Sequence, residues 1–100
     1  MTPAASARAR LAAAGLDDEQ VTRLVDAALA EDLAGCQDVT SVATVPARAE
    51  ATARFVARAD GVVAGLDVVE LVLARASDGR LRCRALARDG ESVTAGQALL

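Results

Sequence analysis

Alanine sets the strongest limit on what this chain can fold into, because it supplies 25 of the 100 residues. Side chains large enough to fill a core are scarce: there is one Phe and one Met, and there is neither Trp nor Tyr. A buried methyl group contributes far less free energy than a buried Leu or Phe side chain. A chain of this size also buries only about 60–65% of its unfolded surface. We therefore expect a single domain with a marginal core that relies on a partner or on more chain.

The composition excludes several functional classes. The chain has no His and no Lys, so it lacks the commonest general base, the commonest zinc ligand and the amine of Schiff-base or P-loop chemistry. Its 11 Arg residues are outnumbered by 14 acidic residues, and only one residue is aromatic. These numbers argue against nucleic-acid binding. No apolar run is long enough to span a membrane, and the N-terminus lacks the pattern of a secretory signal.

The two cysteines, Cys36 and Cys83, lie far apart and neither belongs to a CxxC pair. A secreted disulfide scaffold carries more cysteines at tighter spacing. We therefore expect two reduced thiols, no metal site built on them, and a cytoplasmic location.

Two segments have the pattern of capped helices. Asp17 precedes an apolar periodicity that runs to about Leu33, and Gln20 stands three residues after it as in a capping box. Asp67 and Glu70 have the same relation at the start of a second helix, which Ser77-Asp78-Gly79 is expected to end. The expected apolar faces are Val21, Leu24, Val25, Ala28 and Leu29 in the first helix, and Val68, Leu71, Val72 and Ala76 in the second.

The remaining pattern predicts strands. Residues 49–58 and 80–88 alternate between apolar and polar positions, which is typical of half-buried strands. Asp60-Gly61 is a turn signal, so we expect residues 49–58 to form a hairpin with residues 62–65. The predicted fold class is α+β, an antiparallel sheet with helices on one face. Residues 1–15 are expected to be a flexible or weakly helical arm, and residues 16–100 the domain.

The last residues, 98–100, are apolar and have no polar terminus after them. This pattern indicates a chain truncated before its continuation. We expect an exposed apolar patch there, with self-association or loose packing. The patch would comprise Val93, Ala98, Leu99 and Leu100.

Three groups of residues could carry chemistry. Glu31 and Asp32 with Asp38 could form a general acid/base pair or a Mg²⁺ site. The favoured interpretation is a helix end followed by a turn, because a metal site needs more convergent ligands than this one segment supplies. Residues 38–41, which include Thr40, could cradle phosphate, but they lack the required glycines and fit a loop with hydroxyl-to-backbone hydrogen bonds. The row Arg80, Arg82 and Arg84 could bind phosphate or carboxylate, and a solvated strand face is the favoured alternative.

An ordered set of motifs resembles the opening of quinolinate phosphoribosyltransferase, also called carboxylating nicotinate-nucleotide pyrophosphorylase, a type II phosphoribosyltransferase. The motifs are residues 27–33 followed by 38–41, then residues 43–47, then 57–65, and finally Asp89-Gly90 with Val93 and Gly96. The resemblance covers residues 16–100 and implies the small N-terminal α/β sandwich domain of that family. A departure is that Ala34-Gly35-Cys36-Gln37 stands where the family has a glycine-rich link.

The resemblance implies a role in NAD synthesis. The whole enzyme would make nicotinate mononucleotide from quinolinate and phosphoribosyl diphosphate, with Mg²⁺ accompanying the diphosphate. The domain would contribute to a homo-oligomer, a dimer or higher, and would cap an active site whose catalytic, substrate-binding and metal residues lie in a later barrel. None of these residues can be assigned here, so we expect this chain alone to be inactive and to bind no Mg²⁺. The alternative is a non-catalytic interaction module with a barrel-sandwich-like fold.

Overall fold

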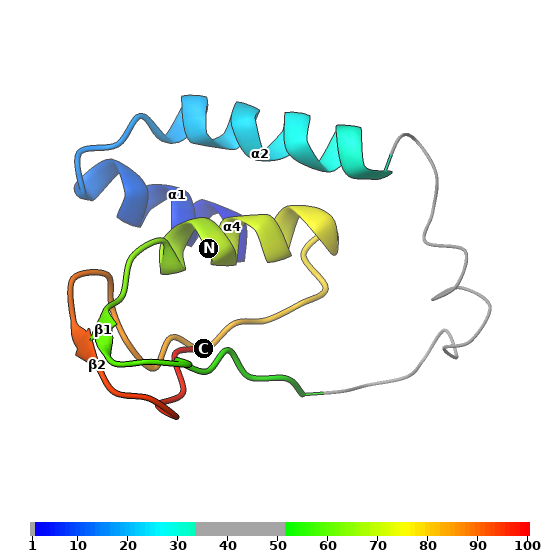
Figure 1. The fold of residues 1–100 in the computed structure, drawn as a ribbon. Coiled ribbons are helices and arrows are strands. Elements are labelled where there is room, and N and C mark those ends of the chain that lie inside the picture. Colours follow the sequence, from blue (N-terminus) through cyan, green and yellow to red (C-terminus); the bar gives the residue numbers. More distant parts are fainter. Residues whose placement is uncertain (1, 34–51) are drawn as a thin grey trace.

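The computed structural model describes residues 2–33 and 52–100. Within these ranges, three helices lie on one side of a layer of strands and extended segments (Figure 1). The elements are α1 (Pro3–Ala13), α2 (Asp18–Leu33), β1 (Gly61–Val62), α4 (Leu66–Ala76) and β2 (Ser92–Val93). The strands pair antiparallel, with Gly61 opposite Val93. The predicted α+β class is therefore confirmed.

Helix α1 occupies the segment for which we allowed either a flexible arm or a weak helix. The Thr2 hydroxyl accepts a hydrogen bond from the Ala5 amide at 3.1 Å, and Pro3 begins the helix. Ala7 and Leu11 are fully buried in a cluster with Val25 of α2 and Leu71 of α4. The sequence argument required several large apolar anchors in this segment. One Leu is enough because the neighbouring helices supply the other large side chains, and because Ala7 lets them approach.

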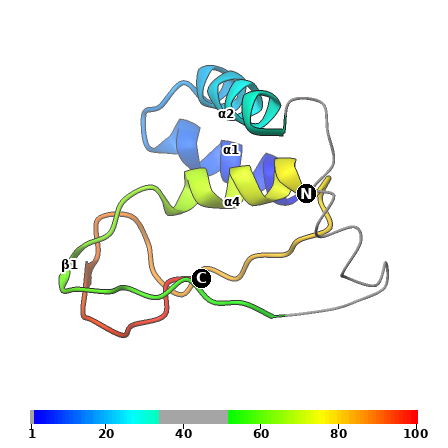
Figure 2. The same cartoon turned by 45° about the vertical axis from the view of Figure 1, so that its right-hand side comes forward.

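Helix α2 begins and ends as predicted. The Asp17 carboxylate accepts a hydrogen bond from the Gln20 amide at 3.2 Å, which is the expected cap, and the helix ends at Leu33. The predicted apolar face is only partly correct, because Val25 is buried whereas Leu24 is 64% exposed. Helices α1 and α4 both lie on the same side of α2, so the stripe that they cover is narrower than a fully buried helix face (Figure 2).

Helix α4 ends as predicted at Ala76, but its start shows that the Asp67 cap was wrong. The helix begins at Leu66, directly after Gly65, whose φ of 92° lies in the left-handed region that glycine tolerates. Its cap comes from far along the chain: the Asp89 carboxylate accepts a hydrogen bond from the Leu66 amide at 2.9 Å. Asp67 instead accepts a hydrogen bond from Arg10 at 2.6 Å.

Replacing Asp89 should therefore destabilise the domain more than replacing Asp67. Asp89→Ala leaves an amide at the start of α4 without its acceptor, and we expect a loss of about 0.5–2 kcal/mol in the free energy of unfolding. Asp67→Ala removes one contact of a half-exposed Arg side chain and should cost less. Urea unfolding of the two variants checks the order. Equal losses, or a larger loss for Asp67→Ala, would contradict the assigned cap.

The predicted hairpin is wrong. Residues 52–58 do not pair with residues 62–65; residues 56–62 instead run antiparallel to residues 92–98, through a bridge between Val56 and Ala98 and through the β1–β2 pair. The predicted turn residue Asp60 accepts a hydrogen bond from the Ala95 amide at 2.8 Å. Residues 80–88 also form no strand. Apart from local bonds at their two ends, to Ser77 and Glu91, the described residues offer them one backbone hydrogen bond, from the Leu86 amide to the Leu99 carbonyl at 2.9 Å.

The predicted exposed patch at the C-terminal end is wrong as well. Val93 and Leu100 are 7% and 9% exposed and form a second cluster with Leu66 and Ala87. Ala98 and Leu99 are half-buried. The reason is the antiparallel pairing with residues 55–57, which holds the last residues in the middle of the layer beneath α4.

Candidate functional site

An apolar groove of about 750 Å³ opens where the extended segments diverge. Residues from four parts of the chain line it: 52–55, Leu73 of α4, 81–84 with Leu86, and Ala98 with Leu100. Its large apolar side chains include Phe55, Leu81 and Leu86, which are 45%, 47% and 48% exposed. Exposed apolar side chains gathered in one concave place indicate a binding surface.

Backbone hydrogen bonds hold the walls of the groove in place. The Leu99 amide donates to the Phe55 carbonyl at 2.7 Å, and the Phe55 amide donates to the Leu100 carbonyl at 3.3 Å. On the other side, the Leu86 amide donates to the Leu99 carbonyl. The end of the chain therefore lies between the two walls, as the red, green and orange segments show in Figure 2.

The groove is positively charged. Arg54, Arg82 and Arg84 belong to its lining and are exposed, and no side chain of the lining is acidic. None of the three forms an ion pair with an acidic side chain of residues 2–33 or 52–100. Of the predicted arginine row, Arg82 and Arg84 thus belong to the groove, whereas Arg80 is exposed outside its lining. An Arg side chain suits a carboxylate or phosphate partner.

Cys83 also lines the groove but is not an activated nucleophile. Burial, and secondly the negative charge of Glu70, raise the pKa of the Cys83 thiol above its ordinary value. A thiolate is the reactive form of cysteine, so a raised pKa leaves Cys83 inert near neutral pH. It is a free thiol in the structure, as predicted. Cys36 lies outside the described residues.

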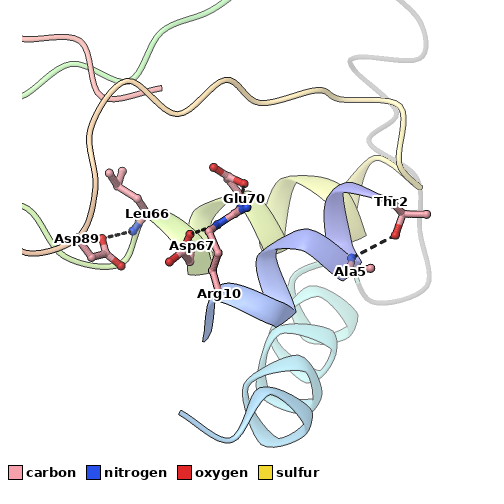
Figure 3. A network of polar contacts seen from close by, with 7 residues as sticks. All are labelled: Thr2, Ala5, Arg10, Leu66, Asp67, Glu70 and Asp89. Atoms are coloured by element: carbon pink, nitrogen blue, oxygen red, sulfur yellow. Dashed lines mark hydrogen bonds and ion pairs between the residues drawn. The ribbon is translucent and has the colours of Figure 1, made fainter. Parts of the chain in front are cut away.

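A polar network joins α1 to α4 (Figure 3). Arg10 donates hydrogen bonds to both Asp67 and Glu70. The hydrogen bond to Asp67 is the main cause that raises the pKa of the Arg10 guanidinium. Glu70 is only 8% exposed, so its charge needs this partner. The network is structural, since it fastens the N-terminal helix to the rest of the domain.

The acidic group considered in the sequence analysis lies only partly within the described residues. Glu31 and Asp32 are exposed in the last turn of α2, while Asp38 and Thr40 lie outside the described residues, as does the whole segment 38–41. In the part of the chain that the structure describes, no group of three Asp, Glu or Cys side chains could hold a metal ion.

The groove lies in the part of the chain that is related to a known family. Residues 38–100 match the sequence model of the N-terminal domain of quinolinate phosphoribosyl transferase. The chain belongs to this family. The match begins after α2, so the groove, α4 and both strands fall within it, whereas α1 and α2 precede it.

Plant enzymes of the same family are similar to this domain. A mitochondrial decarboxylating quinolinate phosphoribosyltransferase from Nicotiana tabacum is 38% identical over 69 residues, which are 69% of this chain and 19% of the relative. A chloroplastic carboxylating nicotinate-nucleotide pyrophosphorylase from Arabidopsis thaliana is 36% identical over 73 residues, 73% of this chain and 21% of the relative. The matched part of the chain thus spans about a fifth of each relative. Within residues 2–33 and 52–100, no helix has the length and apolar character needed to cross a membrane.

Sequence reasoning missed the groove. It predicted that the segments holding Phe55 and Leu81, residues 49–58 and 80–88, form half-buried strands, so a groove between them was not foreseen. One signal was available in the sequence. Residues 49–58 and 80–88 both alternate as strands do, but the chain has too few other strand-like segments to pair with both of them.

Proposed function

We propose that this domain takes part in forming nicotinate mononucleotide from quinolinate and phosphoribosyl diphosphate, as the dimer-forming and active-site-capping N-terminal domain of the enzyme. The observation that carries the proposal is the combination of family membership over residues 38–100 with an apolar groove in that same region. A domain that works alone has little reason to leave Phe55, Leu81 and Leu86 half-exposed in one place.

The reacting groups lie elsewhere in the enzyme in this proposal. Transfer of a phosphoribosyl group requires stabilisation of a departing diphosphate and binding of a dicarboxylate, tasks that use convergent cations and a metal ion. Here the exposed arginines of the groove, Arg54, Arg82 and Arg84, are surrounded by apolar side chains and by no metal ligand set in the described residues. We therefore assign Mg²⁺ and both substrates to the rest of the enzyme.

A chimera tests the proposal. The N-terminal domain of the Arabidopsis relative is replaced by this chain, and formation of nicotinate mononucleotide from quinolinate, phosphoribosyl diphosphate and Mg²⁺ is measured. We expect activity within about tenfold of the parent enzyme, against none for the relative without any N-terminal domain. Sedimentation should show the same oligomer for chimera and parent. An inactive chimera that is folded and assembles like the parent would refute the proposed role.

The isolated chain should form no nicotinate mononucleotide under the same conditions. Its 11 Arg residues are its only side-chain cations. Of the described ones, Arg8, Arg10 and Arg75 are paired with carboxylates, and the three in the groove have no metal ligand set beside them in the described residues. The measurement is product formation by the purified chain, with a mock purification as the control. Turnover above that control would place catalytic groups in this domain and overturn the assignment.

For the compartment we propose the cytoplasm, supported by the free thiol of Cys83. The names of the tobacco and Arabidopsis relatives assign those proteins to mitochondria and chloroplasts. Imaging of the complete protein in its own cell would decide between these locations.

A further inference from the structure

We propose that α1 and α2 together form a cover, residues 3–33, which opens from α4 as one unit while α4 and the strand layer stay folded. The strand layer denotes residues 55–63 and 86–100, which include β1 and β2. The charge of Arg10 keeps the cover closed. This inference goes beyond the proposed function and does not depend on it, because it concerns only how the helices of this chain are held together.

The domain has two apolar cores, one on each side of α4. The first comprises Ala7, Leu11, Val25 and Leu71, and the second comprises Leu66, Ala87, Val93 and Leu100. The two cores share no residue, and among the described elements α4 alone contributes to both. Helices α1 and α2 contact each other and α4, but neither β1 nor β2. Figure 1 shows the same order, with α4 between the cover and the strand layer. Loss of the first core therefore leaves the second one intact.

Charge fastens the three helices to one another. Every ion pair among residues 2–33 and 52–100 joins two of these helices. The pairs are Arg8–Asp18 between α1 and α2, Arg75–Asp26 between α4 and α2, and Arg10 with Asp67 and Glu70 between α1 and α4 (Figure 3). Apart from Glu70, these side chains are partly exposed, so salt screens their attraction.

Backbone hydrogen bonds hold the strand layer instead. The Gly90 amide donates to the Val63 carbonyl, and the Gly96 amide donates to the Ala57 carbonyl, both at 2.8 Å. Among the described residues, no ion pair lies within the strand layer. Salt screens the attraction between exposed charges far more than it weakens backbone hydrogen bonds. The cover and the strand layer should therefore respond differently to ionic strength.

Arg10 matters most among these pairs, because one of its partners is nearly buried. Glu70 is 8% exposed, and its carboxylate accepts a hydrogen bond from the Arg10 guanidinium. A buried carboxylate that loses its cation is strongly unfavourable. Opening of the cover returns Glu70 to water and removes that cost. The closed arrangement is therefore stable only while Arg10 carries its charge.

The apolar seam between the cover and α4 contains few large side chains. Helix α1 buries one of them, Leu11, and otherwise Ala7, while α2 contributes Val25. A buried alanine contributes far less free energy than a buried leucine. A seam of this kind permits opening at a lower free energy than global unfolding requires. Opening uncovers the apolar side of α4 around Leu71.

Amide hydrogen exchange of the purified chain, followed by mass spectrometry, tests the cover. Arg10→Met keeps the apolar stem of the side chain and removes its charge. We expect exchange in peptides covering α1 and α2 to become about tenfold faster or more, because Glu70 is left buried without its cation. Exchange in peptides covering residues 57–63 and 90–97 should change by less than about twofold. Arg23→Met is the matched control, because Arg23 is exposed on α2 and forms no ion pair with the described residues. It should leave both sets of peptides unchanged.

Two further measurements separate the charge of Arg10 from its packing. The double variant R10M/E70M replaces both partners by apolar side chains of similar size, so no charge remains buried. Exchange in α1 and α2 should then return to within about threefold of the original chain. The second measurement needs no variant. Raising NaCl from about 0.02 M to about 0.5 M should speed exchange in α1 and α2 by about threefold and leave residues 57–63 and 90–97 unchanged.

Three results would overturn the proposal. Equal acceleration in the cover and the strand layer would show that the domain opens as a whole. Unchanged exchange in α1 and α2 of Arg10→Met would show that Arg10 does not hold the cover. A double variant that exchanges as fast as Arg10→Met would assign the effect to packing of the Arg10 stem instead of its charge. If Arg10→Met fails to fold, the salt response of the original chain decides between separate and common opening.

Discussion

Leu71→Ala is expected to lower the free energy of unfolding by about 2–5 kcal/mol, the largest loss among the substitutions considered. Leu71 is 0% exposed and lies in the cluster in which α1, α2 and α4 meet. Removing its side chain leaves a cavity that the neighbouring Ala7 is too small to fill. In a domain with so few large apolar residues, a loss of this size is a large fraction of the total stability.

Urea unfolding followed by circular dichroism measures the effect. Leu24→Ala is the matched control, because this substitution removes the same atoms at a helix position that is 64% exposed. Its effect should stay within about 0.5 kcal/mol. If both variants lose the same stability, the three helices do not pack around Leu71 as described. If Leu71→Ala fails to fold, Leu71→Met should still fold, since it conserves volume, with a loss below about 1.5 kcal/mol.

The helix limits that depend on local chemistry could be predicted from the sequence. Asp17 caps α2 through an amide three residues away, and the Ser77–Gly79 stop ends α4. The cap of α4 could not be predicted in this way, because its acceptor, Asp89, is 23 residues from the Leu66 amide. Asp67 has the right residue type and spacing for a cap, but the helix begins at Leu66, two residues before the start that a cap at Asp67 implies. The Asp67 carboxylate pairs with Arg10 instead.

Strand pairing was harder to predict, because alternation shows that a segment suits a sheet but not which partner it has. Asp60-Gly61 looked like the turn of a local hairpin. The chain instead pairs residues 56–62 with residues 92–98, a contact that only the three-dimensional arrangement specifies. Left-handed conformations at Gly90 and Gly96, with φ of 91° and 87°, permit the turns at the two ends of the returning segment. The spacing of these glycines was visible in the sequence, although the partner was not.

The candidate site was also predictable only in part. The sequence shows the row of arginines, but whether they line a binding surface depends on which residues the fold places beside them. Arg82 and Arg84 border an apolar groove because folding brings them beside Phe55, Leu73 and Leu100, which are distant in sequence. Of the acidic residues considered for chemistry, Glu31 and Asp32 are exposed in the last turn of α2, and their proximity in sequence brought no further described ligand to them.

Ala7→Leu is expected to destabilise the domain by about 1–3 kcal/mol, although leucine is the more apolar residue and a good helix former. Ala7 is 0% exposed where α1 packs against α4, so the added carbons must displace a helix or force strained rotamers. Ala9→Leu is the control at an exposed position of the same helix and should change stability by less than about 0.5 kcal/mol. Thermal and urea unfolding of both variants measure the difference. Stabilisation by Ala7→Leu would show that α1 lies loosely on the domain. The expected loss would show that small residues set the spacing of this core, so that its alanines are a packing requirement as well as a compositional bias.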